Sequence, residues 1–241
     1  IGLGIPAEPL FRSRDNYVQT KDMLSSSTGK ITCQYYDGLG RPVETAKDIN
    51  GKYVYTLQTY DGKGRISEDW LSAPGSSTLN YLNSIASISS SFYGENYAYS
   101  ATTYDALDRP VFIQTPGQGW HNAQKGITKE YLSNAANSVK CYHAVLNNNS
   151  IIENGFYGQN TLYAEKTTDE DGRLVTVYTD KLGRRVLERR DTNNDTYYVY
   201  DDLGDLRFVL PPQVAYYYKD NTGATISTTS TQMLQYGYEY R

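Results

Sequence analysis

Aspartate and arginine recur four residues apart around a glycine, and this is the strongest chemical pattern in the chain. The first copy is Tyr36-Asp37-Gly38-Leu39-Gly40-Arg41-Pro42-Val43. The aspartate can accept a hydrogen bond from the backbone N–H two residues on, as in an Asx-turn, and it can pair with the arginine. The arginine could also lie over the preceding tyrosine as a cation-π partner. This spacing predicts a turn rather than a catalytic centre.

The unit returns five more times. Close copies occupy residues 60–66, 104–111 and 200–206, and looser copies occupy residues 169–174 and 179–186. The candidate turn residues are Tyr36, Asp37, Gly40, Arg41, Tyr60, Asp61, Gly64, Arg65, Tyr104, Asp105, Arg109, Asp180, Gly183, Arg184, Tyr200, Asp201 and Gly204.

Each copy must lie at the tip of a β-hairpin to place these side chains. Gly40 can take a positive φ without penalty, so the chain can reverse there, and the flanking tyrosine and valine favour strands. Asp37 and Asp61 are 24 residues apart, and Asp180 and Asp201 are 21 apart. Because self-similarity at a fixed period is typical of repeat architectures, we expect neighbouring hairpins to bury one another's faces.

Two acidic clusters invite a calcium interpretation. Residues 169–171 are Asp-Glu-Asp, and residues 191–202 begin with the alternating acidic spacing of an EF-hand. The sixth position of the second cluster is Thr196 rather than glycine, and the twelfth is Asp202 rather than glutamate. Hairpin loops are therefore the favoured interpretation, and we expect no metal.

The sequence gives little support to an enzyme. His121 and His143 are the two histidines, and neither lies in an HExxH motif or near a GxSxG serine. Carboxylates are abundant enough for a glycosidase-like acid pair, but most stand where a turn accounts for them. We expect no catalytic residue and no cofactor.

Tyrosine dominates the aromatic residues, with 25 tyrosines against 5 phenylalanines and 2 tryptophans. Exposed aromatic rings could stack on sugars, and the candidates for a carbohydrate-binding surface are Trp70, Trp120, Tyr93 and Tyr97. The Tyr216-Tyr217-Tyr218 run belongs to the same hypothesis. Cross-strand aromatic packing is the favoured alternative, because a repeat sheet needs it anyway.

Composition excludes two classes of partner. The chain has 241 residues, a hydrophobic fraction of 39% and a net charge of −4, which is not the basic footprint of a nucleic-acid binder. No apolar run has the length of a membrane span. Cys33 and Cys141 lie 108 residues apart without CxxC spacing, which favours two unpaired small hydrophobic residues over a disulfide or metal site.

Strands are expected near residues 16–23 and on both sides of each tip, with two insertions near 71–100 and 116–160. In the first insertion, Ser76, Ser77 and Thr78 predict the start of a helix that carries Leu79, Leu82, Ile85 and Ala86 and ends before Gly94. The second predicts an irregular hairpin of residues 126–131 and 139–145. Pro211-Pro212 should stop the sheet. A short helix is expected near residues 229–235, and residues 238–241 should begin a strand.

The repeats resemble the YD repeats of the Rhs family, which toxin-complex C subunits and teneurins share. Beyond the Tyr-Asp dipeptides, the resemblance is carried by residues 180–187, 197–204 and 210–212, together with Pro116-Gly117, Trp120 and the Asn16-Tyr17-Val18 opening. These stretches look like the N-terminal region of Rhs-type proteins of Bacteroidetes. The resemblance covers nearly the whole chain.

The resemblance implies an all-β, mostly antiparallel fold in which YD-repeat hairpins form a curved sheet, part of an Rhs-type shell, with one or two short helices in insertions. It implies a lead-in segment at residues 1–30 and a YD-repeat domain at 31–241. The implied function is a structural, non-catalytic wall of a secreted or cell-surface protein that encloses a C-terminal passenger, often a toxin. The family's self-cleaving aspartyl site lies outside the resembling stretches, so it supplies no catalytic residue here.

The partners expected are the remaining repeats and the passenger of the same polypeptide, with glycans as an alternative ligand. An exposed sheet edge should also let this fragment form an edge-mediated homodimer.

Overall fold

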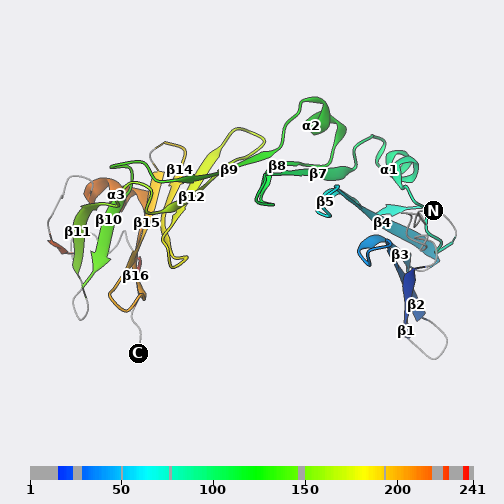
Figure 1. Ribbon diagram of the computed structural model, residues 1–241, viewed down its shortest axis with the longest axis horizontal. Coiled ribbons are helices and arrows are strands. Elements are labelled where there is room, and N and C mark those ends of the chain that lie inside the picture. The colour runs from blue at the N-terminus through cyan, green and yellow to red at the C-terminus, as the bar shows by residue number, and fades with distance from the viewer. Residues whose placement is uncertain are drawn as a thin grey trace, which may run out of the picture. The chain divides into compact units, whose positions relative to one another are not determined.

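The computed structural model describes residues 16–23, 29–49, 51–75, 78–145, 150–192, 194–218, 225–227 and 236–238. The chain divides into two compact units, Ile1–Gly126 and Ile127–Arg241. Both are built mainly from antiparallel β-strands, as the repeats predicted (Figure 1). Of the described strand pairs, that of β10 with β15 is parallel and the others are antiparallel. The division into a lead-in and one repeat domain stays a prediction.

The first unit is a sheet of successive hairpins. Its strands are β1 (Tyr17–Met23), β2 (Gly29–Tyr36), β3 (Pro42–Ile49), β4 (Lys52–Tyr60), β5 (Ile66–Trp70), β6 (Ala73–Pro74), β7 (Tyr99–Tyr104) and β8 (Pro110–Gln114). Pairing runs from β1 through β2, β3 and β4 to β5, and then across the first insertion to β7 and β8. Strand β6 pairs with the first half of β4.

Alternation along β3 and β4 places one face of this sheet in a core. Ala46, Tyr55 and Leu57 are buried, and the two buried residues of β4 are separated by the partly exposed Thr56. Cys33, Tyr35 and Ile85 complete the same cluster of buried side chains.

The first insertion forms a shorter helix than the sequence predicted. Helix α1 (Ala86–Tyr93) ends at the left-handed Gly94, as expected, but it begins eight residues after Thr78. Leu79 and Leu82 instead lie in a non-helical segment that packs on the core of the sheet. The predicted start was wrong because the sheet binds the backbone of this segment: the Tyr35 hydroxyl donates to the Leu79 carbonyl at 2.5 Å. Ser76 and Ser77 lie outside the described residues.

The second unit contains the remaining strands. They are β9 (Ile127–Ser133), β10 (Lys140–Ala144), β11 (Ser150–Phe156), β12 (Tyr163–Thr168), β13 (Leu174–Thr179), β14 (Arg185–Arg190), β15 (Asn194–Tyr200), β16 (Leu206–Leu210), β17 (Thr225–Ser227) and β18 (Tyr236–Gly237). Pairing runs from β9 through β12, β13, β14, β15 and β16 to β18. Strand β11 lies between β10 and β17.

The second insertion does not form the expected hairpin. Strands β9 and β10 occur where strand-like pieces were predicted, but β9 pairs with β12 and β10 pairs with β11. The prediction was wrong because β12, whose residues lie 30 to 40 positions after their partners in β9, pairs with β9 in a continuous antiparallel register that a local pattern cannot show. A short helix, α2 (Gln118–Asn122), which the sequence analysis missed, lies near the end of the first unit, and β9 begins the second.

Helix α3 (Pro212–Tyr218) follows β16 at the predicted proline stop. A proline is well suited to the first turn of a helix, where its missing N–H has no partner to lose. Val214, Ala215 and Tyr218 are buried in the core of the second unit, together with Leu187, Val199 and Leu210 among others. The helix predicted at 229–235 and residues 239–241 of the predicted final strand lie outside the described residues.

Candidate functional site

The candidate site is the set of hairpin tips and the contacts that join them. At the first tip the N–H of Asp37 donates to the Arg41 carbonyl at 2.9 Å, and the N–H of Gly40 donates to the Asp37 carbonyl at 3.0 Å. Gly40 has a φ of 77°. The same two backbone bonds close all six tips, with Asp108 at a φ of 62° where the others have glycine.

The turn aspartate holds each tip through one carboxylate oxygen. Asp37 Oδ1 accepts the N–H groups of Leu39 and Arg41, both at 2.9 Å. The equivalent bonds at the other five tips measure 2.8–3.0 Å. The carboxylate therefore replaces a backbone acceptor in the turn, which is why aspartate is required at this position.

The second carboxylate oxygen accepts the arginine. Arg41 Nε and Nη2 lie 2.7 Å and 2.6 Å from Asp37 Oδ2. The Asp61–Arg65, Asp105–Arg109 and Asp180–Arg184 pairs repeat this geometry within 0.1 Å. With two donors on each oxygen, these carboxylates have used the four acceptor sites they possess. They have no site left for a metal or a substrate proton.

The pKa values of the turn aspartates follow from these bonds. The hydrogen bond from the Arg65 side chain, together with the backbone N–H groups of Arg65 and Lys63, lowers the pKa of Asp61 to about 2. Burial raises the pKa of Asp37, but the hydrogen bonds from Arg41 and Leu39 outweigh it, so the pKa is lowered overall. Asp37 and Asp61 therefore stay ionised well below neutral pH.

The arginine of one tip also covers the tyrosine of the next. The guanidinium carbon of Arg41 lies 4.3 Å from the ring centroid of Tyr60, and the Tyr60 hydroxyl donates to the Pro42 carbonyl at 2.6 Å. We call this pair of contacts a rung. The sequence prediction that the arginine reaches back over its own tyrosine was wrong, because the extended β3–β4 register brings Arg41 opposite Tyr60.

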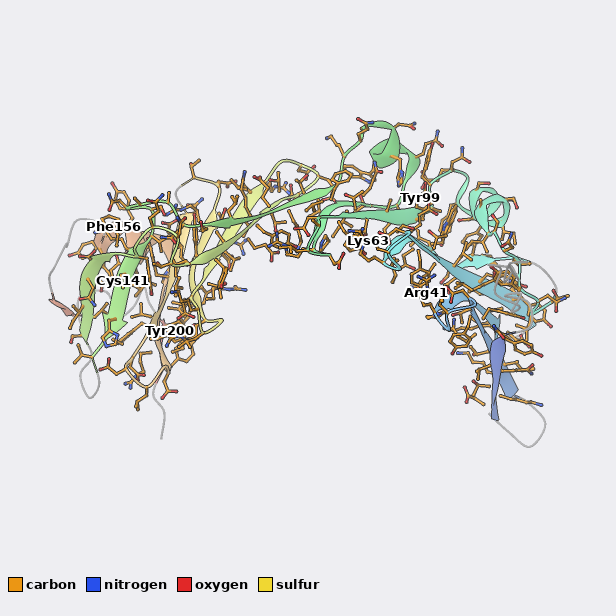
Figure 2. All side chains as sticks on the ribbon, viewed as in Figure 1. Arg41, Lys63, Tyr99, Cys141, Phe156 and Tyr200 are labelled. Atoms are coloured by element: carbon orange, nitrogen blue, oxygen red, sulfur yellow. The ribbon has the colours of Figure 1, made fainter. Side chains whose placement is uncertain are left out.

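Two more rungs repeat this geometry. Arg65 lies 4.6 Å from the Tyr104 ring, and the Tyr104 hydroxyl donates to Ile66 at 2.8 Å. Arg184 lies 4.8 Å from the Tyr200 ring, and the Tyr200 hydroxyl donates to Arg185 at 3.0 Å. In Figure 2, where Arg41 and Lys63 are labelled, these residues mark the tips of successive hairpins in the first unit.

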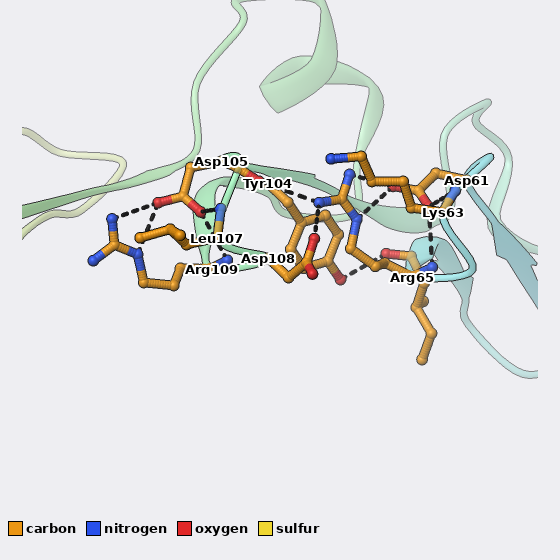
Figure 3. A network of polar contacts seen from close by, with 9 residues as sticks. Asp61, Lys63, Arg65, Tyr104, Asp105, Leu107, Asp108 and Arg109 are labelled. Atoms are coloured by element: carbon orange, nitrogen blue, oxygen red, sulfur yellow. Dashed lines mark hydrogen bonds and ion pairs between the residues drawn. The ribbon is translucent and has the colours of Figure 1, made fainter.

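The second rung shows how the sheet continues past an insertion. Arg65 binds Asp61 of its own tip and, through Nη1, Asp108 Oδ1 at 2.7 Å and the Asp105 carbonyl at 3.2 Å (Figure 3). The two tips are 44 residues apart in sequence. Asp108, which departs from the repeat's glycine, therefore supplies an acceptor to the neighbouring arginine.

The last three copies lack the tyrosine or the arginine of the repeat and keep the turn. Arg173 is exposed and lies 3.8 Å from Asp169, and the tyrosine position of the following copy holds Thr179. At the sixth tip Asp205 replaces the arginine, and Arg207 Nη1 approaches Asp201 Oδ2 at 3.4 Å instead. The aspartate turn is thus independent of the rung.

The four residues predicted for carbohydrate binding make different contacts, and their role in sugar binding stays a prediction. Trp70 is partly buried, packs against the core and lies 4.5 Å from the Tyr99 ring. Tyr97 and Trp120 are partly exposed, and the Tyr97 ring stacks on His121 at 4.6 Å and an interplanar angle of 13°. The Tyr93 hydroxyl donates to the Ser72 carbonyl at 2.7 Å.

The histidines, cysteines and acidic residues that could take part in catalysis or metal binding have different surroundings in the described part of the chain. His143 Nε2 lies 3.1 Å from Asp202. Among the described residues, no three His, Cys, Asp or Glu side chains gather into a group that could hold a metal ion. Cys33 is buried, Cys141 is partly buried, and both are free. In the described part of the chain, no helix has the length and apolar character needed to cross a membrane.

Sequence reasoning missed three buried ionisable side chains, Glu44, Lys140 and Glu153. Glu44 is 1% exposed and accepts the N–H of Leu82 at 3.1 Å; burial raises its pKa to about 7, although hydrogen bonds from Leu82 and Asn83 oppose the rise. Lys140 Nζ pairs with Glu153 at 2.9 Å, and Glu153 is fully buried. Glu44 stands at an inward position of an alternating strand, which is the one signal the sequence offered.

Comparison with known proteins gives a family and two structural relatives. No curated protein matches the chain. The crystal structure of TcdB2-TccC3 without hypervariable C-terminal region is 15% identical, with a TM-score of 0.43, over 84% of this chain and 10% of that chain. The crystal structure of TcdB2-TccC3-TEV is 9% identical, with a TM-score of 0.33, over 80% of this chain and 12% of that chain. The chain thus spans about a tenth of the length of these relatives.

The family model described as a domain of unknown function, DUF6443, matches residues 11–133. This stretch takes in the first three hairpin tips, both rungs of the first unit and helices α1 and α2. Because the match covers half of the sequence, the chain belongs to the DUF6443 family.

Proposed function

We propose that this chain is a structural, non-catalytic segment of an Rhs-type YD-repeat wall, in a secreted or cell-surface protein that encloses a C-terminal passenger. The single observation that carries the proposal is the rung. Arginine and tyrosine side chains that could bind a ligand instead contact each other and join one hairpin to the next. The pairs are Arg41–Tyr60, Arg65–Tyr104 and Arg184–Tyr200.

The carboxylates support the same conclusion. Four turn aspartates accept two backbone N–H groups and two guanidinium N–H groups each. A general acid or base must exchange a proton with a substrate near its working pH, and a carboxylate saturated by donors with a depressed pKa is poorly suited to that task.

The proposal of an enclosed passenger rests on the resemblance of the sequence to the Rhs family. A hollow wall serves to keep an enclosed polypeptide from water and from proteases, and the repeat lengthens such a wall simply by adding hairpins. The remaining repeats and the passenger of the same polypeptide are then the main partners of this segment.

Limited proteolysis of the complete natural polypeptide tests the proposal. We expect the C-terminal passenger to survive a protease concentration that cleaves it once the wall is unfolded by denaturant. The double variant Arg41→Gln and Arg65→Gln should expose the passenger sooner, because it removes two rungs. Arg173→Gln is the matched control, since Arg173 is exposed and pairs with the exposed Asp171 at 3.1 Å. A passenger cleaved equally fast with the wall folded or unfolded would refute enclosure.

A carbohydrate-binding surface is the second candidate. The observation in its favour is Tyr97, a bulky residue held at a φ of 63° with its ring stacked on His121, which follows Trp120 in helix α2. Strained backbone at a partly exposed aromatic residue is common at binding sites. A glycan array probed with the wild type and with Tyr97→Ala checks it: binding lost in the variant supports a sugar site, and no binding by the wild type removes this candidate.

A further inference from the structure

Tyr36, the first tyrosine of the repeats, lies beside a cavity. The tyrosines of the three rungs are each covered by an arginine side chain. The cavity has a volume of about 340 Å³ and is lined by Asn16, Tyr17, Val18, Tyr36, Asp37, Gly38 and Gly40. It therefore adjoins both Tyr36 and the tip of the first hairpin. The corresponding space at the three rungs is occupied by a guanidinium group.

Strand register identifies the residue that should fill the cavity. Arg41, Arg65 and Arg184 each stand opposite the tyrosine they cover when the registers of β3–β4, β5–β7 and β14–β15 are extended to the tip. The same extension of β1–β2 places Asn16 opposite Tyr36, and the N–H of Tyr36 donates to the Asn16 carbonyl at 2.9 Å. Asn16 thus stands in the arginine position with a side chain too short to cover the ring.

The surroundings of the turn glycines also differ between the first tip and the tips that an arginine covers. A Cβ placed on Gly64 would lie 2.8 Å from Arg41 Nη1, and one on Gly204 would lie 3.3 Å from Arg184 Nη1. Arg41 and Arg184 therefore each lie against the glycine of the tip that they cover. Among the described residues other than its two chain neighbours, none has an atom within 4 Å of a Cβ placed on Gly40.

We propose that this cavity is a binding site for the arginine side chain of a partner polypeptide, which would complete the missing rung over Tyr36. A planar guanidinium can stack on the tyrosine ring and still donate to backbone carbonyls at the tip, as Arg65 does at Tyr104 and Asp105. An ammonium group has no plane to stack, so lysine fits the site less well.

The first test fills the cavity from within the chain. Asn16→Arg should raise the Tm, because it supplies the arginine at the register position that the three rungs use. Asn16→Lys should raise the Tm less, and the gain of Asn16→Arg should vanish when it is combined with Tyr36→Leu. An Asn16→Arg protein that folds with an unchanged or lower Tm would overturn the proposal.

The second test supplies the arginine from outside. A peptide with the sequence Gly-Leu-Gly-Arg-Pro-Val, which copies residues 38–43, is titrated into the isotope-labelled chain. We expect NMR shifts at Tyr36 and Gly40, and a dissociation constant about two- to fivefold weaker when glutamine replaces the peptide's arginine. Asn16→Arg should abolish the shifts. Equal binding of the two peptides, or shifts that leave Tyr36 and Gly40 unaffected, would overturn the proposal.

A third variant separates a partner's arginine from the chain's own. Residues 1–15 contain Arg12 and Arg14 and lie outside the described residues. If the arginine peptide binds only after both are changed to alanine, the occupant is internal and a partner site is refuted. Binding that is the same with and without the two substitutions supports the partner site.

Discussion

At the scale of single residues, the turn aspartate is the group on which the molecule depends. Its part in the tip followed from local chemistry, because the partners of Asp37 lie within four residues of it. The tyrosine that each arginine covers could not be predicted in the same way. Arg41 covers Tyr60 because of a strand register that a sequence window of eight residues does not contain.

Two glycines in the same turn position should differ in their tolerance of a side chain. Gly40→Ala should cost about 1 kcal/mol of unfolding free energy, because alanine is strained at positive φ. Gly64→Ala should cost roughly 0.5–1 kcal/mol more, because its Cβ would displace Arg41 Nη1 from the Tyr60 rung. Urea unfolding of the two variants measures the difference. Equal losses would mean that the arginine moves aside without cost.

At the scale of elements, each rung joins two hairpins through two separable contacts. Tyr104→Phe removes the hydroxyl bond to Ile66 and should cost about 1 kcal/mol of unfolding free energy. Tyr104→Leu removes the stacking of Arg65 as well and should cost more. Tyr163→Phe is the control, since Tyr163 is 68% exposed and should change stability by less than about 0.5 kcal/mol. A Tyr104→Phe protein as stable as this control would show that the hydroxyl bond contributes nothing.

The first insertion shows how tertiary contacts override local helix signals. Leu79, Leu82 and Ile85 have helical spacing, but Glu44 accepts the N–H of Leu82, and the Tyr35 hydroxyl donates to Leu79. The sequence predicted the apolar residues correctly and placed the helix start wrongly. No local pattern could reveal that a glutamate 38 residues earlier binds this segment.

Glu44 should make stability depend on pH near neutrality. Its folded pKa of about 7 lies above the usual value of about 4.5, so the folded state holds an extra proton between these values and loses stability as the pH rises through them. The unfolding free energy should fall by up to about 3 kcal/mol from pH 4.5 to pH 8. Glu44→Gln should flatten this slope in urea unfolding.

The turn aspartates Asp37 and Asp61 titrate at lower pH than Glu44, so their contribution to stability can be measured separately from that of Glu44. Their lowered pKa values add stability that is present above about pH 4 and lost as the pH falls toward 2. A Glu44→Gln protein that keeps the wild-type slope between pH 5 and pH 8 would assign that slope to other groups.

At the scale of the whole chain, four of the hairpin tips expose an apolar side chain at the same position of the turn. The third turn residue is leucine in four copies, and these side chains are 72–78% exposed: Leu39, Leu107, Leu182 and Leu203. Lys63 and Asp171 occupy the same position in the other two copies, and their tips have the same backbone bonds. The fold therefore does not need leucine here, and the exposed leucines are available for contacts with other molecules.

Replacing the four leucines with lysine tests which surface drives self-association of this chain. We expect the unfolding free energy to change by less than about 1 kcal/mol, because the side chains are exposed and Lys63 already serves one tip. Light scattering at high protein concentration should give a mass above the 27.2 kDa of one chain for the wild type and a mass near it for the variant. A wild type that stays at 27.2 kDa would contradict association by either route. A variant that still dimerises would exclude the leucines and leave pairing between sheet edges, which lysines at the tips do not block.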